Sequence, residues 1–312
     1  MAFAFRRPVE GVGCVEIPSG GSTINVYVLG TARRAVLVDC GVAETAEEVI
    51  ATLGANGYGP GAIRAIVVTH GHGDHYGGAA GLARWSGADL FAHPAAAARI
   101  EDHWGSFIDP GSPSQNLSAA DWERGQATGG EPVRVARLLR EGDVIRQGAV
   151  RLEVLHTPGH ESGQITLYDP KRRAVFVGDL VQGGMDASPN WLGLFTDIAS
   201  QRKGLQRVRS LAPAWLFKGH RVERRDAEAQ ADLAAASTRL DIISESLVEA
   251  LRERSPMTLA EATRAAFRAA LPIEPPAELP NYAVTSTLAF LLELSHQGRA
   301  RRRPDLSWEF VG

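Results

Sequence analysis

Runs of apolar residues with frequent β-branching dominate the first 40 positions, and Gly/Ser turns or a short polar link separate them. This pattern predicts three strands, over residues 11–17, 22–30 and 34–41. The apolar spacing then changes to i, i+3, i+4, i+7 over residues 46–53, which predicts a helix. Thr45 and Glu48 form a capping-box signature at the start of that helix.

Strand and helix patterns continue to alternate as far as residue 217. We expect strands over 62–69, 89–93, 144–157, 164–169, 173–180 and 214–217, and helices over 78–85 and 197–211. Residues 94–141 are less regular, with scattered Gly, Pro and Ser, so we expect part helix and part long loop there. The alternation indicates an α/β body.

The pattern becomes helical after residue 220. One apolar face over residues 233–251 predicts a long helix, and the Ser255-Pro256 pair ends it. Thr258 and Glu261 form a second capping box, which opens a helix over 258–270. The end of the chain is therefore expected to be a region of packed helices.

A proline-rich connector leads to a final helix over 281–297, and a basic stretch and the segment LSWEF follow it. The length of 312 residues fits two domains. We therefore divide the chain into an α/β body over residues 1–221 and a small helical, winged-helix-like domain with a β-wing over residues 222–312.

Composition narrows the class of protein. The hydrophobic fraction is 44%, the charged fraction is 22% and the formal net charge is −3, as in an ordinary soluble globular protein. Nothing in this balance calls for a nucleic-acid or membrane partner. The chain has only two cysteines, no secretory leader pattern and no apolar run long enough to span a bilayer, so we expect a cytoplasmic protein.

The chemistry concentrates after the strand predicted at 62–69. His70, His72, Asp74 and His75 form an H-x-H-x-D-H cluster flanked by glycines. Imidazole and carboxylate side chains together suit Zn²⁺, and also Fe or Mn. Glycine permits the tight backbone that convergence on one ion needs. We interpret the cluster as part of a metal site.

Three more ligand-type residues follow other predicted strands. His160 lies in HTPGHESGQ, Asp179 in VFVGDL and His220 in LFKGH. An isolated Asp179 or His220 would be read as an ordinary polar residue. Four strand ends that each deliver such a residue instead indicate an active site placed at the loops of a rigid scaffold.

At this point the sequence resembles a known family. THGHGDHYGG, TPGHESGQ, VGDL and the GH at 219–220 are similar, in order and spacing, to the four metal motifs of the metallo-β-lactamase-fold hydrolases. The resemblance implies an αββα sandwich with two metals at one edge. It further implies that His70, His72 and His160 hold one metal, that Asp74, His75 and His220 hold the other, and that Asp179 bridges them.

The helical tail resembles that of the lactamase-β-like branch, which includes endoribonucleases and polyketide thioesterases, whereas glyoxalase II hydrolases share the motifs without obviously sharing this tail. The resemblance implies two divalent ions per chain, with Zn²⁺ expected before Fe or Mn, and attack by a metal-bound hydroxide on an ester-type carbon. Asp74 is the expected catalytic residue, because it can orient that hydroxide and carry a proton.

The leading functional hypothesis is a hydrolase of small-molecule thioesters, esters or lactones. Trp191, Leu194 and Phe195 follow the bridging aspartate and are candidate walls of an apolar pocket, although ordinary core positions explain them equally well. A homo-oligomer is compatible with this hypothesis.

Two other functions stay open. The arginines between residues 299 and 303 give a single-strand-specific endoribonuclease a local basic patch, although neighbouring acidic residues dilute it. A mononuclear iron oxygenase of the same fold ranks lower, because all seven ligand positions are filled. The tail is expected to cover the active-site mouth or form a dimer interface before it binds nucleic acid.

Overall fold

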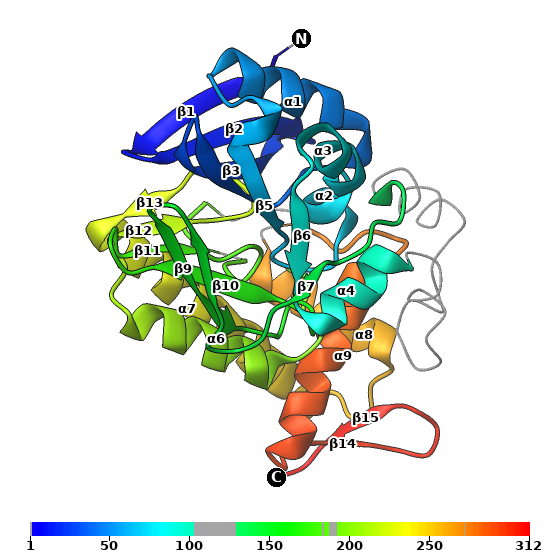
Figure 1. Cartoon of the computed structure of the whole chain (residues 1–312). Helices are drawn as coiled ribbons and strands as arrows, with labels where there is room; N and C mark the ends of the chain where they lie inside the picture. The colour runs from blue at the N-terminus through cyan, green and yellow to red at the C-terminus, as the bar shows by residue number, and fades with distance from the viewer. Residues whose placement is uncertain (1, 103–128, 183, 187–191, 272) are drawn as a thin grey trace. The chain divides into compact units, whose positions relative to one another are not determined.

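A computed structural model describes residues 2–102, 129–182, 184–186, 192–271 and 273–312 (Figure 1). The chain folds as two compact units that interleave along the sequence. The first comprises Met1–Thr157, Ser162–Asp179 and Pro213–Asp226, and the second comprises Pro158–Glu161, Leu180–Ala212 and Ala227–Gly312. The domain boundary between residues 221 and 222 stays a prediction.

The first unit contains two β-sheets. The strands of the seven-stranded sheet follow chain order: β1 (Ala4–Val9), β2 (Val12–Ser19), β3 (Ser22–Thr31), β4 (Arg34–Val38), β5 (Ile63–Val67), β6 (Asp89–Ala92) and β7 (Arg137–Leu138). Strands β1 to β4 pair antiparallel, and β4 to β7 pair parallel. The parallel half therefore points the ends of β4, β5 and β6 to the same edge.

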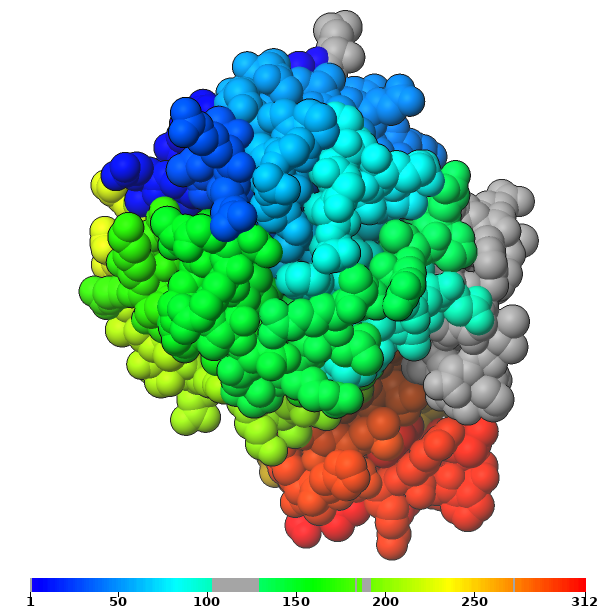
Figure 2. Space-filling model, in the orientation of Figure 1, coloured from blue at the N-terminus to red at the C-terminus, as the bar shows by residue number. Residues whose placement is uncertain are grey.

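The second sheet is mostly antiparallel. Its spatial order is β13 (Arg224–Arg225), β12 (Trp215–Phe217), β11 (Ala174–Phe176), β10 (Ile165–Asp169), β9 (Val150–His156) and β8 (Val144–Gln147). Only β11 and β12 run parallel. In Figure 2 the green segments of β8 to β10 and the blue and cyan N-terminal segments form one continuous surface of the first unit.

Burial on both faces explains why the strands read as continuous apolar runs. On β3, Val26 and Val28 pack in a core shared with the helices, whereas Tyr27 and Leu29 pack in a second core shared with the other sheet. The helices of this unit are α1 (Ala46–Ala55), α2 (Gly73–Tyr76), α3 (Ala79–Ser86) and α4 (Pro94–Glu101), with short 3₁₀ turns at Ala43–Thr45 and Pro60–Ala62.

The second unit is mainly helical. Its elements are α6 (Ile198–Ser210), α7 (Asp226–Glu253, which begins at the last residue of the first unit), α8 (Leu259–Ala270), α9 (Asn281–His296) and a hairpin of β14 (Ala300–Arg302) and β15 (Trp308–Phe310). Arg202 on α6 is paired with Glu293 on α9 and with Asp241 on α7, so one guanidinium joins three helices. The predicted α/β class with a helical C-terminal region is confirmed.

Local predictions had mixed outcomes. The capping box of Thr258 and Glu261 is present, with both reciprocal hydrogen bonds. The box at Thr45 was wrong, because a 3₁₀ turn precedes the helix and the Thr45 hydroxyl donates to the Val42 carbonyl instead. Strand β1 was not predicted, since its arginines and Pro8 break the apolar run.

The basic stretch of the tail carries paired charges. Arg299 is paired with Glu245 of α7, and Arg301 and Arg303 both approach Glu309 of β15. Among the residues that the structure describes, no helix has the length and apolar character needed to cross a membrane.

Candidate metal centre

Four side chains of the first unit converge on one point. The His75 Nε2 atom lies 3.4 Å from Asp179 Oδ1, 3.4 Å from His220 Nε2 and 3.7 Å from Asp74 Oδ2. His220 Nε2 lies 3.2 Å from Asp74 Oδ2 and 3.5 Å from Asp179 Oδ2. Residues from three separate predicted strand ends are therefore brought together.

These separations match the ligand shell of an ion. Ligand bonds of about 2.0–2.2 Å place the atoms of a tetrahedral zinc shell about 3.3–3.6 Å apart. The observed separations run from 3.2 to 3.7 Å. The backbone is shaped for this group as well: a Cβ at Gly219 would come within 2.5 Å of the His75 ring and 2.6 Å of Asp179 Oδ1. The chemical types of the four side chains and the separations of their donor atoms both fit a divalent cation.

The cluster also favours positive charge. Burial opposes the charged form of His75, but Asp74, Asp179 and Asp39 outweigh it and raise the pKa of His75 to about 9. Burial likewise opposes the charged form of His220, and Asp179 and Asp74 together raise its pKa well above the ordinary value. A divalent cation would supply the same charge and displace these protons.

Asp39 orients two of the histidines from a buried position at the end of β4. Its Oδ2 accepts hydrogen bonds from His75 Nδ1 at 2.9 Å and from the Thr69 hydroxyl at 2.9 Å. That hydroxyl lies 3.1 Å from His70 Nδ1 and, since it donates to Asp39, accepts from the imidazole. Both rings therefore carry the Nδ1 proton, which leaves the Nε2 lone pair for a metal.

Strand β3 orients His220 in the same way. The Nδ1 atom of His220 lies 2.9 Å from the Thr23 carbonyl oxygen, to which it donates. The buried Asn25 side chain donates to the carbonyl oxygens of Lys218 and Arg221, on either side of the histidine. The short segment that carries His220 is thus fixed to the seven-stranded sheet.

Asp39, Thr69 and Thr23 were not among the predicted functional residues. Asp39 had a signal, because it is an acidic residue that directly follows a buried strand, in VDCG. Thr23 had none, because it contacts His220 through its backbone carbonyl.

The loop after β5 positions His70, His72, Asp74 and His75. The rings of His70 and His72 lie 4.8 Å apart, centroid to centroid, and His72 is the N-cap residue of α2. The short helix α2 then brings Asp74 and His75 close to Asp179 and His220. Gly71 packs against the Arg99 side chain of α4, which leaves little room for a side chain at that position.

His160 belongs to the second unit, on the segment Pro158–Glu161. Its Nδ1 atom lies 2.7 Å from the Leu194 carbonyl oxygen. The Gly159 carbonyl accepts hydrogen bonds from the backbone of Thr196 and Asp197. The Nδ1 contact with a carbonyl oxygen is the same kind that orients His220, and an imidazole that donates this bond keeps its lone pair on Nε2. The Gln182 amide nitrogen also lies 2.7 Å from this Nδ1 atom.

The candidate substrate residues have different surroundings. Phe195 is 1% exposed and packs edge-on against Phe290 of α9, so it lies in the core of the second unit. Leu194 is half-buried. Trp191 lies outside the described residues. The substrate-binding role of all three stays a prediction.

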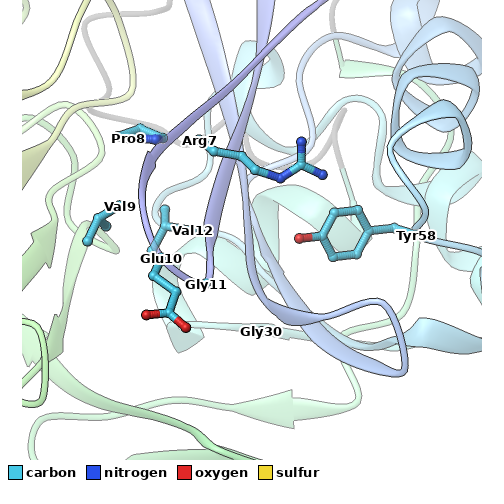
Figure 3. A pocket seen from close by; sticks show the side chains of 8 residues that line it. All are labelled: Arg7, Pro8, Val9, Glu10, Gly11, Val12, Gly30 and Tyr58. Atoms are coloured by element: carbon cyan, nitrogen blue, oxygen red, sulfur yellow. The ribbon is translucent and has the colours of Figure 1, made fainter.

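A separate hollow of about 550 Å³ lies at the turn between β1 and β2 (Figure 3). Arg7 and Tyr58 face it, and residues 8–12 and Gly30 form the rest of its lining. The Arg7 guanidinium is already bonded to Asn56. The hollow contains none of the predicted metal ligands.

Sequence comparison gives independent information about the family. Residues 19–220 match the model of the Metallo-beta-lactamase superfamily. The acyl-coenzyme A thioesterase MBLAC2 of Gallus gallus is 29% identical over 203 residues, which cover 64% of this chain and 71% of the relative. The hydroxyacylglutathione hydrolase of Cupriavidus taiwanensis is 34% identical over 161 residues, which cover 51% of this chain and 45% of the relative.

Solved structures share the fold over nearly the whole chain. The metallo-beta-lactamase family protein TTHA1429 from Thermus thermophilus superposes with a TM-score of 0.75 at 21% identity and covers 97% of this chain and 99% of its own. A beta-lactamase domain protein from Burkholderia ambifaria gives a TM-score of 0.73 at 22% identity, over 98% and 93% of the two chains. With the family match, this fold and the histidine–aspartate cluster together, the chain belongs to the metallo-β-lactamase superfamily.

Proposed function

We propose that this protein is a dinuclear metal-dependent hydrolase that cleaves thioesters of small molecules. The observation that carries the hydrolytic part is the convergence of His75, His220, Asp74 and Asp179 at ion-ligand spacing. The thioester part is supported by relatives named as an acyl-coenzyme A thioesterase and a hydroxyacylglutathione hydrolase, since both substrates are thioesters. Esters and lactones share the same electrophilic carbon and form the wider substrate class.

The proposed ligand sets follow the family resemblance. His70, His72 and His160 would hold one ion, Asp74, His75 and His220 the other, and Asp179 would reach both. Imidazole and carboxylate donors favour Zn²⁺, and Fe or Mn are the alternatives. When bound, the two ions would lower the pKa of a water molecule and polarise the carbonyl oxygen of the substrate.

Asp74 is the residue proposed to orient the attacking hydroxide. Its side chain is 33% exposed, so it reaches solvent as well as the histidines. Burial raises the pKa of this carboxyl, but His75 and His220 outweigh it and hold the pKa well below the ordinary value. Asp74 is thus a carboxylate at neutral pH, which can accept a hydrogen bond from a water molecule or hydroxide and orient it, but it carries no proton to donate.

That property suits a thioester. A thiol has a pKa of about 8.5, so a thiolate departs without first being protonated. The ribose hydroxyl released when RNA is hydrolysed is far more basic than a thiolate as a leaving group, and calls for a proton donor. A site whose carboxylate is ionised at neutral pH holds no proton for the leaving group, and therefore favours thioesters over RNA.

The test is the rate of hydrolysis of a panel of acyl-coenzyme A and acyl-glutathione thioesters by zinc-loaded protein. We expect turnover on at least one thioester, and loss of most of it in His72→Ala and Asp74→Asn. An aryl ester and a lactone measure the width of the substrate class. Rates equal to those of His72→Ala across the whole panel would reject the proposal.

The endoribonuclease and oxygenase hypotheses gain no support from the described residues. Three arginines of the tail are engaged by Glu245 or Glu309, which reduces their attraction for phosphate. RNA binding that weakens steeply with salt would favour the nuclease. One iron per chain would favour the oxygenase. A homo-oligomer stays part of the proposal, and light scattering of the full chain tests it.

A further inference from the structure

The loop that follows the predicted bridging aspartate is bonded to a predicted metal ligand. His160 Nδ1 lies 2.7 Å from the Leu194 carbonyl oxygen, and the Leu194 N–H donates to Gln182 Oε1 at 2.7 Å. The Gln182 Nε2 atom lies 2.7 Å from the same His160 Nδ1. Both backbone polar groups of Leu194 are therefore occupied, and two different groups compete for one ring nitrogen.

The two contacts on His160 demand opposite tautomers. The Leu194 carbonyl can only accept, so it requires a proton on Nδ1 and leaves the lone pair on Nε2. The Gln182 amide nitrogen can only donate, so it requires a bare Nδ1. The tautomer of His160 thus depends on how firmly the Leu194 carbonyl is held in place.

Helix α9 holds the residues on both sides of Leu194. The Ser286 hydroxyl accepts a hydrogen bond from the Phe195 N–H at 2.9 Å, and it lies 2.8 Å from the carbonyl oxygens of both Gly193 and Tyr282. Ser286 is fully buried. One side chain of the C-terminal helical region therefore fixes the backbone turn that presents the Leu194 carbonyl to His160.

We propose that Ser286 is a positioning residue that acts through residues 193–195 to hold His160 in the tautomer able to bind a metal. The inference rests on the proposed role of His160 as a ligand and extends it to the helical tail. The helical tail thereby controls the protonation of a proposed metal ligand that belongs to the same unit. Loss of the Ser286 hydroxyl loosens the Leu194 carbonyl, and Gln182 then favours the tautomer whose Nε2 carries a proton.

The experiment measures zinc affinity of the full-length, metal-free protein by titration against a chromophoric chelator, with zinc per chain counted by mass spectrometry. Ser286→Ala is expected to weaken one of two zinc sites by about tenfold, the lower end of the effect of removing support from a metal-bound histidine. Thr287→Val is the matched control, because Thr287 is equally buried on α9 and its hydroxyl donates to the Ala283 carbonyl of the helix rather than to residues 193–195. Its zinc affinities should equal those of the wild type.

A rescue variant separates positioning from general damage. In Gln182→Glu, one carboxylate oxygen still accepts from Leu194 and the other accepts from His160 Nδ1, so the competition for the tautomer ends. Adding Gln182→Glu to Ser286→Ala should restore the lost zinc affinity. Nitrogen-15 shifts of the His160 ring in the metal-free variants report the tautomer directly.

The possible outcomes are distinct. If His160→Ala binds both zinc ions with wild-type affinity, the ligand assignment and the proposed function fail. If His160→Ala loses one zinc but Ser286→Ala retains both at wild-type affinity, this inference is overturned and the proposed function stands. Failure of Gln182→Glu to restore affinity in a folded Ser286→Ala protein also overturns it.

Discussion

Replacement of Asp39 by Asn is the sharpest test of how the candidate site is organised. Asp39 accepts three hydrogen bonds: from the Thr69 N–H at 2.7 Å, the Thr69 hydroxyl at 2.9 Å and His75 Nδ1 at 2.9 Å. Asn has almost the same shape but presents a donor on one side. In one orientation the Asn amide nitrogen faces the Thr69 N–H, and in the other it faces the Thr69 hydroxyl and His75 Nδ1, so a donor meets a donor in both cases.

The magnitude follows from these contacts. A hydrogen bond to a charged group contributes about 1.5–3 kcal/mol. Removing the partner that orients a metal-bound histidine typically costs about 10–100-fold in metal affinity, or about 1.4–2.8 kcal/mol. Both routes agree, so we expect Asp39→Asn to weaken zinc binding by about 10–100-fold, although Asp39 contributes none of the proposed ligand atoms.

The assay is zinc affinity by chelator competition, beside the thermal unfolding midpoint of the metal-free protein. Asp169→Asn is the control, since Asp169 is buried too but accepts from the backbone of Lys171 and Arg172, at the end of β10. It should lower the unfolding midpoint and leave zinc affinity unchanged. Zinc affinity within twofold of wild type in Asp39→Asn would refute the orienting role of Asp39.

Gly219→Ala should abolish zinc binding at the His75 site, because the added Cβ would lie 2.5 Å from the His75 ring. Gly61→Ala is the control and should leave zinc binding unchanged, because a Cβ at Gly61 meets no atom within 4 Å. The zinc content of each variant after dialysis measures the difference. The pKa of His75 is raised to about 9 in the folded metal-free protein, so the bound proton stabilises that fold fully below the ordinary pKa of about 6.5, and this stabilisation is lost as pH rises through 9. Since zinc must displace this proton, zinc affinity should rise about tenfold per pH unit between pH 7 and 9 for each proton displaced. A zinc affinity measured by calorimetry that does not change over this pH range would contradict the prediction. Thr258→Ala should remove the capping box of α8 and cost about 1 kcal/mol in denaturant unfolding, whereas an unchanged midpoint would mean that α8 does not depend on its cap.

The sequence was informative where one local pattern determines the structure. The alternation of strand and helix, the long helix α7 and the capping box at Thr258 were all predictable, because each depends on residues close in the chain. The glycine-flanked histidine cluster also depends on residues close in the chain, and for that reason the sequence alone indicates a metal-binding loop.

Features that depend on tertiary packing were not predictable. Thr45 has the right residue type for a cap, but a preceding 3₁₀ turn redirects its hydroxyl to Val42. The roles of Thr23 and Leu194 rest on their backbone carbonyls, which carry no sequence signal. The link from Ser286 to residues 193–195 joins positions some 90 residues apart, and only the folded chain brings them together.

Two divalent ions held by this chain are proposed to support thioester hydrolysis. The most direct measurement is the number of zinc equivalents that restore acyl-thioester turnover to the metal-free, full-length protein. The account predicts negligible activity without metal and full activity at two equivalents, with His220→Ala unable to recover. Full turnover in metal-free protein, or no turnover at any zinc level, would contradict it.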